Sequence, residues 1–194
     1  MVGPFIVIIT VGCAYLLLAS MGDSLGKFSV DQILEKAVIT QRDLKSDYYG
    51  GNSFDIGDFD STLPSILSVS HRALFAGLFR PFITETRNIL MFISSLENLA
   101  LLIFTISLLI RLRVFGFFKY FYVNHLLTFS LIFSLFFSWS VGLSTSNFGS
   151  MVRYKIPGLP FFLASLLIIR HLHMKETAAR EQEEQELQKY KQLQ

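Results

Sequence analysis

Long apolar stretches alternate with polar segments along this chain of 194 residues. Four of these stretches are close to the roughly 20 residues that a helix needs to cross about 30 Å of hydrocarbon. The pattern therefore predicts an all-α integral membrane protein with four transmembrane helices. We place these helices at residues 1–20, 89–110, 125–143 and 157–173.

The first stretch has a second interpretation, which is a cleavable signal peptide. Its apolar run is longer than the core of a typical signal peptide, and no Lys or Arg precedes it. We therefore favour a retained transmembrane helix. Because the apolar run starts directly at Met1, a piece of a longer polytopic protein is a further interpretation.

A long polar segment, residues 21–88, separates the first two predicted spans and is expected to form a helical loop region. Ser29 and Gln32 have the spacing of a capping box, in which side chains satisfy free backbone N–H groups where a helix starts. A helix over about residues 30–45 should follow. Residues 65–79 predict a second, mostly apolar helix, which is too short to span and suits the membrane interface.

Charge in the short loops sets the expected orientation, because Lys and Arg in short loops stay on the cytoplasmic side. The segment 111–124 contains three Lys or Arg residues and no acidic residue. We expect this segment and the charged helical tail, residues 174–194, to be cytoplasmic. The N-terminus is then also cytoplasmic, and residues 21–88 are extracytoplasmic.

Composition agrees with a membrane protein, since 52% of the residues are hydrophobic and 16% are charged, against about 25% charged in soluble domains. The net charge is +2, and no basic patch interleaved with aromatic residues indicates a nucleic-acid partner. The single cysteine, Cys13, offers neither an internal disulfide nor a metal cluster. Without a Gly-rich phosphate loop or a nucleophile elbow, we expect no catalytic residue, metal or cofactor.

An acidic loop and the histidines are weaker candidates for ligand binding. Asp55, Asp58 and Asp60 offer oxygens that suit calcium, but the loop lacks the residue order of an EF-hand. The neighbouring phenylalanines suit an interfacial turn equally well. The four histidines are dispersed along the chain, so they predict no metal site.

Glu97 is the sharpest single candidate residue. It lies about eight residues, or roughly 12 Å, into the second predicted span, and Asn98 follows it. An ionised carboxylate in lipid costs several kcal/mol unless it faces protein or water. We expect Glu97 and Asn98 to be buried polar groups. Pairing with a helix of this chain, pairing with a partner subunit, and proton or ion transfer are the open alternatives.

The predicted outer loop before the last span is a second candidate site. It places Arg153 and Lys155 on the side where cations in short loops are disfavoured. This placement predicts contact with an anion, such as a lipid head group, a diphosphate or an acidic partner. Asn147 and Gly149 would shape the turn that presents Arg153. Simple anchoring of these side chains at the interface is the alternative.

The pattern Asn147-x-Gly149-x-x-x-Arg153-x-x-x-Pro157 resembles a segment of bacterial O-antigen polymerases and related polytopic glycan-assembly membrane proteins. These families act on polyprenyl-diphosphate-linked sugars and have many more spans than four. The resemblance implies that Arg153 meets a diphosphate and that this chain is not a complete member. Two further segments, GGNSFDIGDFD at residues 50–60 and LFRPF at residues 78–82, resemble segments of polytopic membrane proteins of Bacteroidota, and this resemblance implies no activity.

The sequence thus favours a non-catalytic accessory or structural subunit that packs within a larger membrane protein complex of the bacterial inner membrane. Its expected partners are membrane lipids and other integral membrane subunits. The alternative is a fragment of a polytopic membrane enzyme of polyprenyl-linked glycan assembly. An ion-coupled carrier is a third interpretation, and it is the weakest because Glu97 stands nearly alone in its span.

Overall fold

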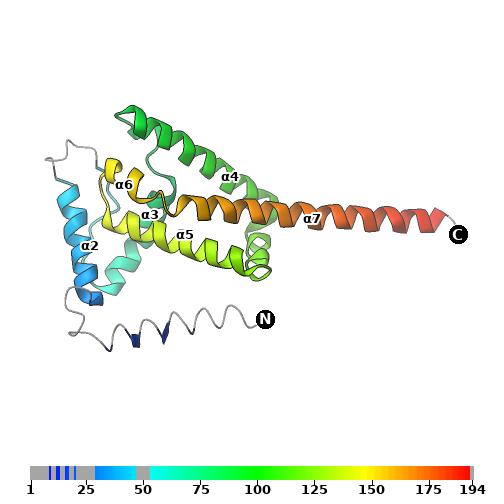
Figure 1. Ribbon diagram of the computed structural model, residues 1–194, viewed down its shortest axis with the longest axis horizontal. Coiled ribbons are helices and arrows are strands. Elements are labelled where there is room, and N and C mark those ends of the chain that lie inside the picture. Colours follow the sequence, from blue (N-terminus) through cyan, green and yellow to red (C-terminus); the bar gives the residue numbers. More distant parts are fainter. Residues whose placement is uncertain are drawn as a thin grey trace.

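The computed structural model describes residues 29–46 and 53–192, together with residues 9, 12, 13, 16, 17 and 20. The predicted first span therefore lies largely outside the described residues. The rest is built from helices that pack side by side, and the last helix extends well beyond them (Figure 1). The helices are α2 (Val30–Leu44), α3 (Leu63–Phe79), α4 (Ile89–Lys119), α5 (His125–Ser144), α6 (Phe148–Tyr154) and α7 (Leu159–Gln192).

Two of the described helices are long and apolar enough to cross a membrane, namely Ile89–Arg113 within α4 and the whole of α5. The pair α6 and α7 adds a third candidate if it counts as one broken span, bent by 62°. The prediction of an all-helical fold is confirmed for the described residues, and two to three helices are long and apolar enough to span a membrane. The count of four spans and their orientation remain predictions.

The two helices predicted within residues 21–88 are present. The Ser29 side chain caps α2 and accepts a hydrogen bond from the Gln32 N–H at 3.4 Å, which supplies one half of the predicted capping box. Pro64 lies in the first turn of α3, where its missing N–H costs no helical hydrogen bond. At the other end of α3, a cis peptide bond joins Arg80 to Pro81.

Among the described helices, α3 and α5 form the most extensive contact. Two glycines make this close approach possible. A Cβ atom added at Gly142 would lie 1.9 Å from the carbonyl oxygen of Ala73, and one added at Gly77 would lie 1.9 Å from the carbonyl oxygen of Ser138. The short apolar helix is therefore held against a membrane-spanning helix, with one face buried inside the protein.

α4 continues past the predicted end of the second span. A kink at Arg113 (φ 53°, ψ 155°) separates its apolar part from a helical extension to Lys119. A 3-10 helix, Tyr120–Tyr122, follows, and the Asn124 side chain caps α5. The structure therefore corrects the predicted loop at residues 111–124, most of which is helical because it lacks proline and keeps an apolar pattern.

A short helix, α6, lies within the predicted loop before the last span. It has seven residues, and a turn at residues 155–158 separates it from α7. α7 begins at Leu159, two residues after the predicted start of the fourth span at Pro157, and continues without a break to Gln192. The predicted fourth span and the charged tail thus form one helix, whose final part projects from the bundle (Figure 1).

Two buried apolar clusters hold the helices together. The first cluster joins α2, the segment before α3, the first part of α3, α4, α5 and α6 around Phe54, Ala73, Met91, Val141 and Met151. The second cluster joins the end of α3 to α4, α5 and α7 around Phe79, Leu108, Leu127, Phe162 and Leu166.

Candidate functional site

Lys155 is the centre of a buried polar cluster at the break between α6 and α7. Its side chain is only 1% exposed. Its Nζ donates hydrogen bonds to the backbone carbonyl of Arg80 at 2.9 Å and to the side-chain oxygen of Asn98. Asn98 in turn donates to the carbonyl of Pro81 at 3.2 Å. Buried polar groups need hydrogen-bond partners, and these three contacts provide them. Together they connect the end of α3 to α4 and to the α6–α7 turn.

This placement corrects the prediction that Lys155 contacts an anion outside the protein. Successive residues of a helix differ by about 100° in direction. Lys155, two positions after Arg153, therefore points to nearly the opposite side, towards α4. Arg153 itself is exposed, and its Nε donates to the Gly149 carbonyl at 3.3 Å.

Asn147 and Gly149 build the turn that leads to Arg153. The Asn147 side chain accepts hydrogen bonds from the N–H groups of Gly149 and Ser150, at 2.9 and 3.3 Å, and caps α6. The arrangement presents the exposed Arg153 guanidinium at the end of α6. Contact between Arg153 and an anion remains a proposal.

Glu97 and Asn98 are neighbours that face opposite environments. Asn98 is 1% exposed, whereas Glu97 is exposed on α4. The described residues of this chain do not bury Glu97, which corrects the prediction that it is a buried polar group. Exposed apolar side chains, including Ile93 and Leu96, lie on the same part of α4.

Arg80 forms an ion pair that the sequence reasoning missed. Its Nε donates to both carboxylate oxygens of Glu85, at 3.0 and 3.2 Å. Its guanidinium also lies over the rings of Phe54 and Phe148, 5.1 and 5.5 Å from their centres. The rings come from segments far apart in sequence, so no local spacing indicated this stack.

The carboxylates of the acidic loop have partners within the protein. Asp55 forms a 2.5 Å ion pair with Lys45 and accepts a hydrogen bond from the Gly57 N–H at 2.8 Å. The hydrogen bond from Lys45 lowers the pKa of the Asp55 carboxyl. Asp60 accepts from the N–H of Thr62, next to the start of α3, at 2.9 Å. These contacts give the loop a structural role between α2 and α3.

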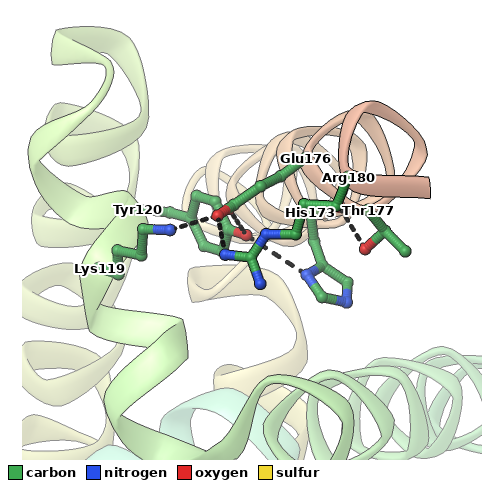
Figure 2. A network of polar contacts seen from close by, with 6 residues as sticks. All are labelled: Lys119, Tyr120, His173, Glu176, Thr177 and Arg180. Carbon is green, nitrogen blue, oxygen red and sulfur yellow. Dashed lines mark hydrogen bonds and ion pairs between the residues drawn. The ribbon is translucent and has the colours of Figure 1, made fainter. Parts of the chain in front are cut away.

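A polar network joins the end of α4 to α7, and Glu176 is its centre (Figure 2). One carboxylate oxygen of Glu176 accepts from Lys119 Nζ at 2.5 Å and from the Arg180 guanidinium at 2.7 Å. The other oxygen accepts from the Tyr120 hydroxyl at 2.7 Å. The Tyr120 hydroxyl also lies 3.3 Å from Nδ1 of His173. Because the hydroxyl proton goes to Glu176, Nδ1 must be the donor in this last contact.

The network fixes the protonation states of its central groups. Hydrogen bonds from Lys119 and Tyr120 lower the pKa of Glu176 to about 2. Burial, followed by the hydrogen bond to Glu176, raises the pKa of Tyr120 to about 12. Glu176 is therefore a carboxylate and Tyr120 a neutral phenol near neutral pH. Glu176 and Arg180 are four residues apart on one helix, a spacing that favours an ion pair. Lys119 and Tyr120 lie more than fifty residues away from Glu176 in the sequence.

Comparisons of the chain with protein-family models, with curated proteins and with solved structures find no match.

Proposed function

We propose that this chain is a non-catalytic subunit that packs in the bilayer against another membrane-spanning helix of a larger bacterial membrane complex. The position of Glu97 carries the proposal. This carboxylate is exposed on α4, within a segment that is apolar enough to cross a membrane. In contact with lipid, it would cost several kcal/mol.

A partner helix with a hydrogen-bond donor or a cation removes this cost. Lys155, which contacts the adjacent Asn98, is already buried and also bonded to the Arg80 carbonyl. The apolar side chains around Glu97, such as Ile93 and Leu96, would pack against the same partner. We place the complex in the bacterial inner membrane, with the tail on the cytoplasmic side.

Photo-crosslinking in intact membranes tests this proposal. A photoreactive residue at Ile93 or at Ala100 lies one helical turn from Glu97. The matched control is Phe129, which is 58% exposed on α5. We expect a discrete protein adduct of higher mass from the two α4 positions and none from Phe129.

The role of Glu97 in that contact is tested with two substitutions. Glu97→Gln keeps the shape and the hydrogen-bonding capacity and should retain the adduct, whereas Glu97→Leu should lose most of it. Adducts with lipid alone from both α4 positions, or an adduct that Glu97→Leu leaves unchanged, would overturn the proposal.

The exposed Arg153 favours a second candidate function, namely a part of a membrane enzyme that acts on polyprenyl-diphosphate-linked sugars. A diphosphate bound bidentately requires the guanidinium fork, so Arg153→Lys should lose glycan product nearly as completely as Arg153→Ala. Arg72→Lys is a control at another arginine, whose side chain bonds the Ile56 carbonyl. Unchanged glycan product in both Arg153 variants would exclude this candidate.

A further inference from the structure

A basic hollow lies beside the polar network, between the end of α4 and α7. It has a volume of about 220 Å³. Its lining residues come from both helices and the short segment after α4, and they include the residues of the Glu176 network that Figure 2 shows. The lining residues that carry charge or can acquire it are Arg111, Lys119, His173, Glu176 and Arg180.

The hollow carries excess positive charge. The lining contains three cationic side chains and one carboxylate, which leaves a net charge of +2 with His173 neutral. The cations are Arg111, Lys119 and Arg180, and the carboxylate is Glu176. Glu176 holds Lys119 and Arg180 side by side, yet their side chains stay 56% and 70% exposed. Their charges are therefore positioned by the protein and remain available to a ligand.

The position along α4 places this hollow at a membrane surface. The apolar part of α4 ends at Arg113, and the lining residues Arg111 and Lys119 lie on either side of that end. Phospholipid head groups occupy this level, just outside the hydrocarbon core. The volume is below the roughly 300–1,000 Å³ of sites for drug-sized ligands, which suits one phosphate group with its ester substituents.

We propose that this hollow binds the phosphate of an anionic phospholipid head group. Arg111 and Arg180 provide guanidinium groups that match phosphate oxygens in pairs, and Lys119 adds a point charge. The Tyr120–Glu176 hydrogen bond and the Glu176 ion pairs hold two of these cations in place before the lipid arrives. The site is independent of the α4 surface around Glu97, which lies within the span.

The test measures lipid binding to the full chain in detergent by native mass spectrometry. The probes are phosphatidylglycerol, phosphatidylcholine and inorganic phosphate. We expect phosphatidylglycerol to bind at least about fivefold more tightly than phosphatidylcholine, with a preference that weakens as salt rises. Inorganic phosphate should compete only weakly, because it lacks the acyl chains that hold the lipid at this level.

Arg111→Gln is the decisive variant, because it removes a lining cation while keeping every hydrogen bond of Glu176. Arg180→Gln removes a second cation together with its ion pair. Each should lower the affinity for phosphatidylglycerol about fivefold or more. Lys189→Gln, at an exposed position further along α7, should not change it.

Three results would overturn the proposal. The first is equal binding of phosphatidylglycerol by the parent, Arg111→Gln and Arg180→Gln. The second is equal affinity of the parent for phosphatidylglycerol and phosphatidylcholine. The third is competition by inorganic phosphate as strong as that of the lipid, which would assign the hollow to a free anion instead.

Discussion

The close crossing of α3 and α5 predicts that a single added methyl group destabilises the protein. In a Gly142→Ala variant, the new Cβ would start 1.9 Å from the carbonyl oxygen of Ala73 and 2.7 Å from its carbonyl carbon. Carbon and oxygen atoms in close interhelical contact are about 3.3–3.6 Å apart. The two backbones must therefore move apart by about 1.5 Å at this point, since neither clashing atom belongs to a flexible side chain.

Overpacking of this kind costs about 1–3 kcal/mol, and the separation also weakens the neighbouring contact at Gly77. The better helix propensity of alanine offsets at most about 1 kcal/mol. We expect a net loss of about 2 kcal/mol, which corresponds to a fall in Tm of about 4–8 °C for a chain of this size. Gly77→Ala should act similarly, and the double variant should lose less than the sum because both sites share one interface.

Trp139 gives a direct assay of this crossing. It is the single tryptophan of the chain, and its indole Nε1 donates to the Ser70 hydroxyl of α3 at 2.9 Å. Thermal unfolding in one detergent, followed by tryptophan emission, therefore reports on the separation of α3 from α5. Gly142→Ala should lower the midpoint and shift the emission of the folded protein as well.

The matched control is Gly116→Ala in α4. A Cβ added there meets only Leu112 Cβ, at 3.6 Å, which is an ordinary contact. This variant should be as stable as the parent or more stable by up to about 1 kcal/mol. If Gly142→Ala unfolds at the same temperature as Gly116→Ala, the reasoning from the close crossing is refuted.

Three further predictions concern the polar groups. Lys155→Met leaves the Arg80 carbonyl and the Asn98 oxygen without their donor, so the free energy of unfolding should fall by about 2–4 kcal/mol. Arg153→Met, its control, should change stability by less than about 0.5 kcal/mol. Equal Tm values for the two variants would contradict this. Arg80→Lys loses the fork that binds Glu85 and should destabilise by about 1–2 kcal/mol in the same assay, because Lys cannot reproduce the bidentate stacked geometry. The pKa of Glu176 is lowered to about 2 in the folded protein from an ordinary 4.5. The stability that Glu176 adds to the folded protein should therefore be complete above about pH 4.5 and be lost as the pH falls through 2. A midpoint near 4.5 in a carboxyl NMR titration would disprove the network.

Local patterns predicted much of the helical structure. Ser29 at a helix start and the apolar run before Arg80-Pro81 indicated α2 and α3 to within a few residues, because caps and chain breaks act over one turn. The apolar stretch at residues 125–143 predicted α5 almost to the residue. The same local reasoning failed at residues 111–124. The charged residues there led to the prediction of a loop, although such residues also fit a helix.

The candidate sites depend on direction around a helix and on contacts between distant segments, which local patterns do not report. Glu97 and Asn98 looked alike in sequence because both are polar residues in one span, yet a step of about 100° exposes one and buries the other. Arg153 and Lys155 were grouped for their charge, and the same geometry sends Lys155 to the carbonyl of Arg80, 75 residues away.

The two ends of the bundle use their charged groups differently, and this difference explains why charge alone was a poor guide. At the α6–α7 break, Lys155 donates to the Arg80 carbonyl and to the Asn98 side chain, so its polar group points inward and stabilises the fold. At the end of α4, one carboxylate, Glu176, gathers several donors and leaves the cations exposed. A sequence-based count of lysines and arginines treats Lys155 and Lys119 as equivalent, whereas the first is buried against a carbonyl and the second stays 56% exposed beside Glu176.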